Sequence, residues 1–253
     1  MRRATAASFN DDTNQVVWKE SLRQGSQMIA TWLAAGSKGV STTAYDTRTF
    51  ALNILLAAGF GRVYDFPSPS DSKDVNSWGN MDYRQALKIV LEHSIAIIAI
   101  GPKTLPKFAW LSKRVAKISK ALEIYQQYMI DMLDEGRSKG SKLGSQGNLL
   151  ATLVRASVKE DQLSQQEVFG NMFVYTFGGH DTTAHSLAFT FLLMSIHPEV
   201  QDWIRDEIKT VFKGDDMSTW DFEDLGKLKR TLAVQVSLPF YPIRATHTYD
   251  SLV

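Results

Sequence analysis

The chain has 253 residues, 44% of them hydrophobic, and its 28 lysine and arginine residues nearly balance 27 aspartate and glutamate residues, for a formal net charge of +1. This balance argues against a dedicated binder of nucleic acid or of anionic membranes. The sequence contains no cysteine. Thiol catalysis, disulfides, cysteine-ligated zinc, iron–sulfur clusters and thiolate ligation of haem by a residue of this chain are therefore excluded.

The N-terminal region carries no secretory signal, because Arg2 and Arg3 are followed by polar Asn10 before any apolar stretch develops. The apolar run 95–100 is far shorter than the roughly 20 residues that span a bilayer. We therefore expect no transmembrane helix and a cytoplasmic location for the chain as encoded.

Helical periodicity dominates the first half of the sequence, where apolar residues recur at steps of three and four. A segment rich in glycine and serine follows at 136–147 and predicts a flexible linker. It lacks the Gly-Lys-Ser/Thr step of a nucleotide-binding loop, so we do not expect it to bind nucleotide. The helices predicted in this half span 12–35, 47–58, 79–100 and 106–135.

A much longer helix is predicted in the second half. Ser164 and Glu167 form a capping box, and no helix-stopping residue follows before the His197-Pro198 step. A helix of about 32 residues, about 48 Å long, fits between them. Apolar residues surround it on every side, as in a helix that runs through the middle of a domain. The sequence thus predicts one all-α domain over 1–253, built around one long central helix.

The midpoint of this helix, Gly178-Gly179-His180-Asp181-Thr182-Thr183, is unsuited to a buried helix. Each glycine costs about 1 kcal/mol relative to alanine, and a buried aspartate needs partners. Helical geometry places Gly178, Asp181, Thr182 and His185 on one face. The Thr182 hydroxyl can also donate to the Gly178 carbonyl and bend the helix. These features predict a notch that could accept a small ligand.

This segment resembles the cytochrome P450 family of haem-thiolate monooxygenases, whose long central helix carries the pattern Ala/Gly-Gly-x-Asp/Glu-Thr-Thr/Ser. The resemblance implies that Gly178 and Gly179 line the oxygen pocket beside a haem. It implies that Asp181 feeds protons and that Thr182 hydrogen-bonds dioxygen. It also implies that Arg2 is the relic of a ligand to a haem propionate.

The resemblance is strongest over 148–235 and weaker over 1–147, and it is closest to fungal members of the family. After Val234 the chain departs from the family pattern, with neither a Glu-x-x-Arg helix nor a cysteine loop. The segment 236–253 is expected to be a non-family tail, as a translated intron would be. The family's N-terminal anchor has no counterpart in this sequence either.

The resemblance implies a truncated, fungal-type P450 monooxygenase. The family inserts one oxygen atom of dioxygen into an apolar small molecule, often in specialised (secondary) metabolism, with electrons from a reductase. It usually works on the cytosolic face of the endoplasmic reticulum. Because the haem-ligating cysteine is absent, we expect this chain alone to be inactive and not to bind haem. The alternative is a non-enzymatic helical binding or interaction module.

A second alternative, a metal-dependent phosphohydrolase, is suggested by the pair His180-Asp181. His180 and His185 are five residues apart and so lie about 140° apart around a helix, which prevents them from gripping one ion. Asp181 and His185 do share a face, but a salt bridge between them is favoured over a metal site. No metal site is therefore predicted.

Overall fold

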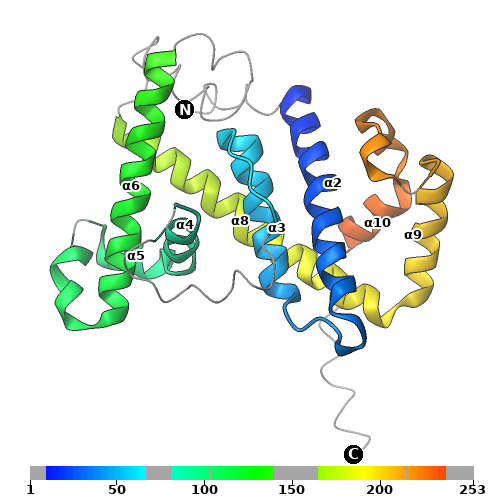
Figure 1. The fold of residues 1–253 in the computed structure, drawn as a ribbon, viewed down its shortest axis with the longest axis horizontal. Coiled ribbons are helices and arrows are strands. Elements are labelled where there is room, and N and C mark those ends of the chain that lie inside the picture. Colours follow the sequence, from blue (N-terminus) through cyan, green and yellow to red (C-terminus); the bar gives the residue numbers. More distant parts are fainter. Residues whose placement is uncertain are drawn as a thin grey trace, which may run out of the picture.

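The computed structural model describes residues 10–66, 81, 83–102, 104–139, 165–214 and 216–237. Every regular element within these residues is a helix, which confirms the predicted all-α class. Figure 1 shows α8 crossing the whole molecule, with the other helices arranged along it. The α-helices are α2 (Asp11–Ala34), α3 (Thr43–Phe60), α4 (Tyr83–Glu92), α5 (Ser94–Ile100), α6 (Lys113–Lys139), α8 (Gln165–Ile196), α9 (Pro198–Val211) and α10 (Lys229–Ser237), and the 3₁₀ helices are η1 (Gly36–Lys38), η3 (Leu105–Leu111), η5 (Met217–Thr219) and η6 (Phe222–Lys227).

The ends of α2 and α3 follow from local chemistry. The Asn10 side chain accepts a hydrogen bond of 2.9 Å from the Thr13 N–H and so caps the start of α2. Helix α3 ends at Gly61, whose φ of 67° is left-handed and favours glycine. The helix predicted over 47–58 continues through Gly59, which lies inside α3. Both helices otherwise form where the apolar periodicity predicted them.

Two predicted helices are divided in the structure. The segment 79–100 contains α4 and α5, which are separated at His93, where φ is −113° and ψ is 16°. The segment 106–135 contains η3 and then α6, which are separated at Ser112, where the backbone is extended. Periodicity alone did not reveal these breaks, because the apolar pattern continues through both.

The predicted linker 136–147 is shorter than expected at its start, since α6 continues through Lys139. Residues 140–147 lie outside the described residues, as do Arg2 and Ser164. Of the predicted tail, Val236 and Ser237 belong to α10, and the rest is likewise outside the described residues.

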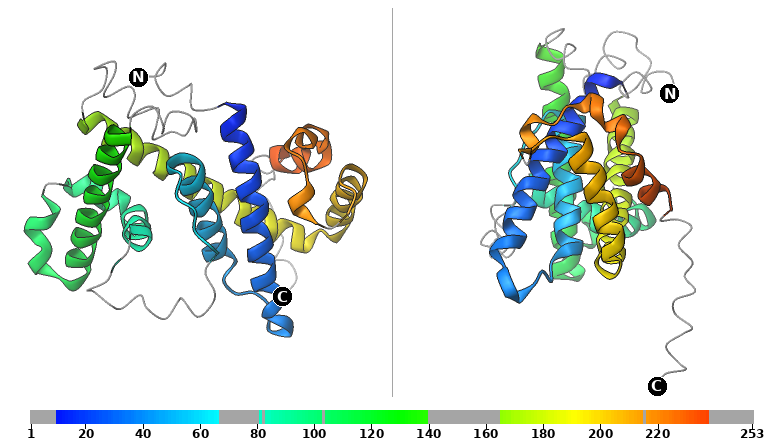
Figure 2. Two further views of the ribbon diagram at one scale, coloured as in Figure 1. Left: turned by 45° about the horizontal axis from the view of Figure 1, so that its top comes forward. Right: turned by 90° about the vertical axis from the view of Figure 1, so that its right-hand side faces the viewer.

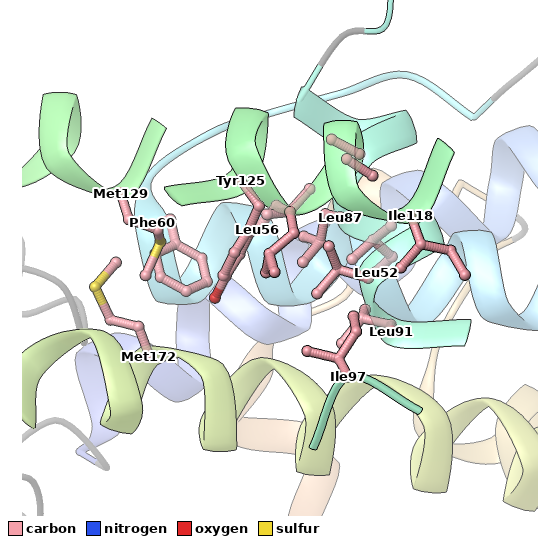
Figure 3. Close-up of a cluster of buried hydrophobic side chains, with 14 of the residues drawn as sticks. Leu52, Leu56, Phe60, Leu87, Leu91, Ile97, Ile118, Tyr125, Met129 and Met172 are labelled. Carbon is pink, nitrogen blue, oxygen red and sulfur yellow. The ribbon is translucent and has the colours of Figure 1, made fainter. Parts of the chain in front are cut away.

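The main hydrophobic core lies between α3, α4, α6 and the first half of α8. Helix α3 packs against α8 on one side and against α2 on the other, as the two views in Figure 2 show. Figure 3 shows side chains from all four core helices meeting in this cluster. Its fully buried members include Leu56, Leu87, Leu105, Met129, Val168 and Met172.

Helix α8 is buried along one stripe rather than all round. Val168, Met172, Thr176, His180 and Ala184 follow one another at four-residue steps and are all buried. Because residues four apart lie on one helix face, this stripe is the face against α3. Although apolar residues surround α8 in the sequence, other faces of the helix leave apolar side chains exposed in the described part of the chain. Large apolar side chains exposed elsewhere on α8 are Val174, Phe177, Phe189, Leu192 and Ile196. No described helix, α8 included, is both long and apolar enough to cross a bilayer.

The start of α10 is held by a buried carboxylate on α9. Glu207 accepts hydrogen bonds from the N–H groups of Arg230, at 2.7 Å, and Thr231, at 3.0 Å. Burial alone would raise the pKa of Glu207, but these hydrogen bonds outweigh it and leave the pKa below its ordinary value. The Arg230 guanidinium also lies 5.3 Å from the centre of the Trp203 ring. No residue of α10 is buried, so these contacts hold the helix in place.

Candidate functional site

The segment predicted to form a notch lies on α8, which remains helical through Gly178-Gly179-His180-Asp181-Thr182-Thr183. The Thr182 hydroxyl donates a hydrogen bond of 2.5 Å to the Gly178 carbonyl, as the spacing predicted. Gly178 and Thr182 are both exposed. A Cβ atom built on Gly178 would meet no atom within 4 Å, so the space in front of this turn is open.

The two glycines of the motif have different surroundings. A Cβ atom on Gly179 would lie 3.3 Å from Leu55 Cδ1, which is tighter than ordinary van der Waals contact. Gly179 therefore permits the close approach of α3 to α8. Gly178 faces open space and leaves room beside Thr182. The family resemblance implied that both glycines line the oxygen pocket. In the structure, Gly179 faces Leu55 on α3 and Gly178 faces open space.

Asp181 is half-exposed and faces two cationic or titratable groups. Its Oδ1 atom lies 3.6 Å from Arg48 Nε on α3 and 3.6 Å from His185 Nδ1 one turn further along α8. The predicted contact between Asp181 and His185 is thus observed. Sequence reasoning missed Arg48, and the available signal was a single charged side chain in the otherwise apolar and neutral stretch 47–60.

Each nitrogen of the His185 ring has a polar neighbour, and these two contacts orient the ring. Nδ1 lies 2.7 Å from the Asp181 backbone carbonyl and Nε2 lies 3.4 Å from Arg48 Nη2. A carbonyl can only accept and a guanidinium can only donate, so this geometry assigns the proton of a neutral ring to Nδ1. Arg48 therefore contacts both exposed polar groups beside the notch.

His180 points the other way, into the contact between α3 and α8. It is 3% exposed, its ring bonds the Arg48 backbone, and its Nδ1 has no hydrogen-bond partner within the described part of the chain. Burial lowers the pKa of His180. The Asp181 carboxylate opposes that effect, while the charge of Arg48 adds to it. His180 and His185 therefore face different sides of α8, as their spacing predicted.

No group of three or more potential metal ligands comes together among the residues the structure describes. His180 is buried against α3, and Asp181 is engaged with Arg48 and His185. His180, Asp181 and His185 thus do not converge on one point where an ion could be held.

A largely apolar groove of about 870 Å³ lies beside the second half of α8. His185 lines it, so the groove adjoins the polar group of Asp181 and Arg48. Its wall on α2 is Trp32, whose ring meets Phe191 edge to face at 5.4 Å and whose Nε1 donates to Asp46. Other lining residues include Val40, Thr43, Ala44, Phe189, Leu192 and Gln201.

The described helices form an all-α fold arranged along one long central helix, α8. The sequence model of the cytochrome P450 family matches residues 21–234, most of the chain. The chain belongs to the cytochrome P450 family.

Curated relatives agree with this assignment. The chain is 30% identical over 241 residues to cytochrome P450 monooxygenase 124 of Postia placenta, covering 90% of this chain and 43% of that protein. It is 30% identical over 224 residues to monooxygenase prx9 of Penicillium rubens, covering 83% and 38%. A P450 of the phomenoic acid biosynthesis cluster of Leptosphaeria maculans is 22% identical over 230 residues, covering 85% and 39%. The chain thus spans less than half the length of these relatives.

Solved structures show the same fold. The haem domain of cytochrome P450DA superposes with a TM-score of 0.68 at 18% identity, covering 92% of this chain and 47% of that domain. A triple mutant of the same domain gives a TM-score of 0.69 at 19% identity, covering 92% and 48%. The described helices therefore reproduce about half of a P450 haem domain.

Proposed function

We propose that this chain is part of a monooxygenase that oxidises an apolar small molecule in specialised metabolism, with electrons from a reductase. The observation that carries the proposal is the notch, where open space in front of Gly178 lies beside the exposed Thr182 hydroxyl. The biosynthetic role is supported by the Leptosphaeria relative, which is a P450 monooxygenase of a biosynthesis cluster.

The notch fits one face of a haem, because a flat group can approach α8 only where no side chain projects, as at Gly178. A bound haem would supply dioxygen binding and electron transfer. Such a haem would also need a cysteine thiolate to hold its iron, and this sequence contains no cysteine. We therefore propose that the 253-residue chain is inactive on its own, and we derive no reaction step through the haem.

The residues of the chain have defined parts in this proposal. The Thr182 hydroxyl donates to Gly178, which leaves its oxygen free to accept a hydrogen bond from a molecule in the notch. The half-exposed Asp181 carboxylate can hold or release a proton at Oδ1. Arg48 and His185 keep that carboxylate beside the turn that bears Thr182. Arg2, outside the described residues, is proposed only by resemblance to contact a haem propionate.

The decisive measurement is the carbon monoxide difference spectrum of the reduced chain supplemented with haem. We expect no band at the position of thiolate-ligated haem, and such a band would contradict inactivity. Sequencing transcripts across the codon for Gln235 tests the proposal that the chain is part of a monooxygenase. A spliced message that continues into a Glu-x-x-Arg helix and a cysteine loop supports it, whereas the absence of any such coding region contradicts it.

A second candidate function is a non-enzymatic binding module. It is favoured by the groove of about 870 Å³ and by the exposed apolar side chains of α8. Binding of an apolar dye in the groove, abolished by Leu192→Arg but not by Leu232→Arg on α10, would support it. Equal binding by both variants would contradict it.

A further inference from the structure

His185 connects Arg48 to Asp181 through both nitrogens of its ring. Its Nδ1 lies 2.7 Å from the Asp181 backbone carbonyl and 3.6 Å from Asp181 Oδ1, and its Nε2 lies 3.4 Å from Arg48 Nη2. Because a guanidinium has only donors, Nε2 can accept from Arg48 only while Nε2 carries no proton of its own. Arg48 Nε lies 3.6 Å from the same Oδ1. The Asp181 carboxylate is therefore shared between a cation on α3 and a titratable ring on its own helix.

Protonation of His185 acts on these two contacts in opposite directions. A proton on Nε2 removes the lone pair that accepts from Arg48 and places two cationic groups 3.4 Å apart. The same charge turns the contact between Nδ1 and Asp181 Oδ1 into an ion pair, while Nδ1 keeps its hydrogen bond to the Asp181 carbonyl. Protonation thus weakens the hold of Arg48 on the carboxylate and strengthens that of His185.

The surroundings of His185 leave the ring open to this change. Its side chain is 51% exposed, so it exchanges protons directly with solvent. Within the described residues, the charged or titratable groups that act on it are Arg48 on α3 and Asp181 and His180 on α8. His180 is buried on the other side of α8. The groove that His185 lines receives no charged side chain from the described parts of α2 and α9.

A second histidine of the chain has the same contacts without the carboxylate. His93 Nδ1 lies 3.1 Å from the Ile89 carbonyl, four residues earlier, and His93 Nε2 lies 3.3 Å from Arg114 Nη2. No acidic side chain forms an ion pair with the His93 ring among the described residues. Protonation of His93 can therefore only break its contact with Arg114. At His185 the broken contact is replaced by an ion pair with Asp181.

We propose that His185 is a pH-dependent switch that determines which side chain holds Asp181. When the ring is neutral, Arg48 ties the carboxylate to α3. When the ring is protonated, His185 holds the carboxylate from within α8 and Arg48 moves into solvent. The inference rests on the proposed function in one respect, since Asp181 is the residue proposed there to hold or release a proton beside the notch. Histidine titrates between pH 5 and 8, so the switch operates near neutral pH.

Nitrogen-15 NMR of the purified chain tests the switch through the Arg48 side chain and requires no haem. The heteronuclear NOE of the Arg48 Nε–H group should be that of a restrained group at about pH 7.5. At about pH 5.5 it should fall to the value of an exposed arginine without a partner. Arg48→Lys identifies the signal by its loss. The matched control is Arg205, which pairs with Asp202 without a histidine and should show the same NOE at both pH values.

Three variants separate the parts of the switch. His185→Gln keeps a side-chain oxygen that can accept from Arg48 but cannot take up a proton near neutral pH, so Arg48 should stay restrained at both pH values. Asp181→Asn should lower the pH at which the His185 ring takes up its proton, and Arg48→Met should raise it, because they remove an anion and a cation. The ring nitrogen shifts of the chain measure both effects.

Arg114→Met provides the control for these titrations, because it should move the titration of His93 and leave that of His185 unchanged. Equal restraint of Arg48 at the two pH values in the unchanged chain would overturn the proposal, and this result does not depend on whether a variant folds. The same pH response in His185→Gln would also overturn it. Failure of the monooxygenase role would leave all of these signals as they are, so the two proposals can fail separately.

Discussion

In the first half of α8, Val168 and Met172 are completely buried, whereas in the second half Phe189 and Leu192 are 60% and 59% exposed. Both halves are equally rich in large apolar residues. The difference arises from their neighbours, because the first half packs into the core with α4 and α6 and the second half borders the open groove. The apolar composition of a helix therefore does not show which of its side chains neighbouring helices bury.

The largest effect on the free energy of unfolding is expected when one apolar side chain is removed from each half of α8 in turn. Met172→Ala should lower the free energy of unfolding by about 2–5 kcal/mol, since it leaves a cavity in the core. Leu192→Ala should change it by less than about 0.5 kcal/mol, since that side chain is mostly in solvent. Urea unfolding of both variants measures the difference. Equal losses would show that the second half of α8 is covered in solution, by self-association for instance.

A second test concerns His180, which lies where the two halves meet. Its pKa is below the ordinary 6.5, so the folded state favours the neutral ring and the unfolded state takes up the proton first. Stability should be fully present above about pH 6.5 and decline as the pH falls below it, by at most about 1.4 kcal/mol per pH unit.

The variant His180→Leu should lose this part of the pH dependence, and the control His185→Leu should keep it, because His185 is exposed. Arg48, Asp181 and His185 are the charged or titratable groups that act on His180, and Arg48 and Asp181 remain in both variants. Thermal unfolding at a series of pH values provides the measurement. Identical profiles for the two variants would show that burial of His180 does not control the effect.

Alanine substitutions at the two glycines of the motif are expected to change the stability of the chain by smaller amounts. Gly178→Ala should stabilise the chain by up to about 1 kcal/mol, because alanine favours helix and its Cβ meets open space. Gly179→Ala should gain less or destabilise, because its Cβ lies 3.3 Å from Leu55. Chemical unfolding of the two variants compares them directly. A larger gain for Gly179→Ala would contradict the close contact of α3 with α8.

The smallest expected effect is that of the ion pair beside the notch. Arg48 and Asp181 are both more than a third exposed, so a double-mutant cycle with Arg48→Gln and Asp181→Asn should give a coupling of about 0.2–1 kcal/mol. High salt should reduce it. A coupling well above this range, or one insensitive to salt, would mean that the pair is shielded from water.

Much of the fold could be predicted because α-helices carry local signals. The apolar periodicity over 12–35 matches α2, and the His197-Pro198 step lies where α8 ends and α9 begins. The breaks at His93 and Ser112 could not be predicted, since neither residue interrupts the apolar pattern. They depend on tertiary contacts such as the packing of η3 on α6 and of α5 on α4.

The candidate site was predictable only along α8. Thr182 and Gly178 bond at four-residue spacing, and Asp181 meets His185 in the same way. Arg48 could not be found by this route, because it is 133 residues from Asp181 in the sequence and its helix gives no sign of which neighbour it meets. The burial of His180 depends on the same contact between α3 and α8.

The attachment of α10 to the rest of the chain depends on the ionised carboxylate of Glu207. Helix α10 has no buried residue, and the backbone N–H groups of its first turn depend on this one carboxylate. Because the pKa of Glu207 is depressed in the folded chain, protonation at acid pH removes stability that is present above its ordinary value of 4.5. Opening of α10 then requires no disturbance of the core around Met172. Amide hydrogens of residues 229–237 should exchange faster than those of α3, and limited proteolysis should cut there first.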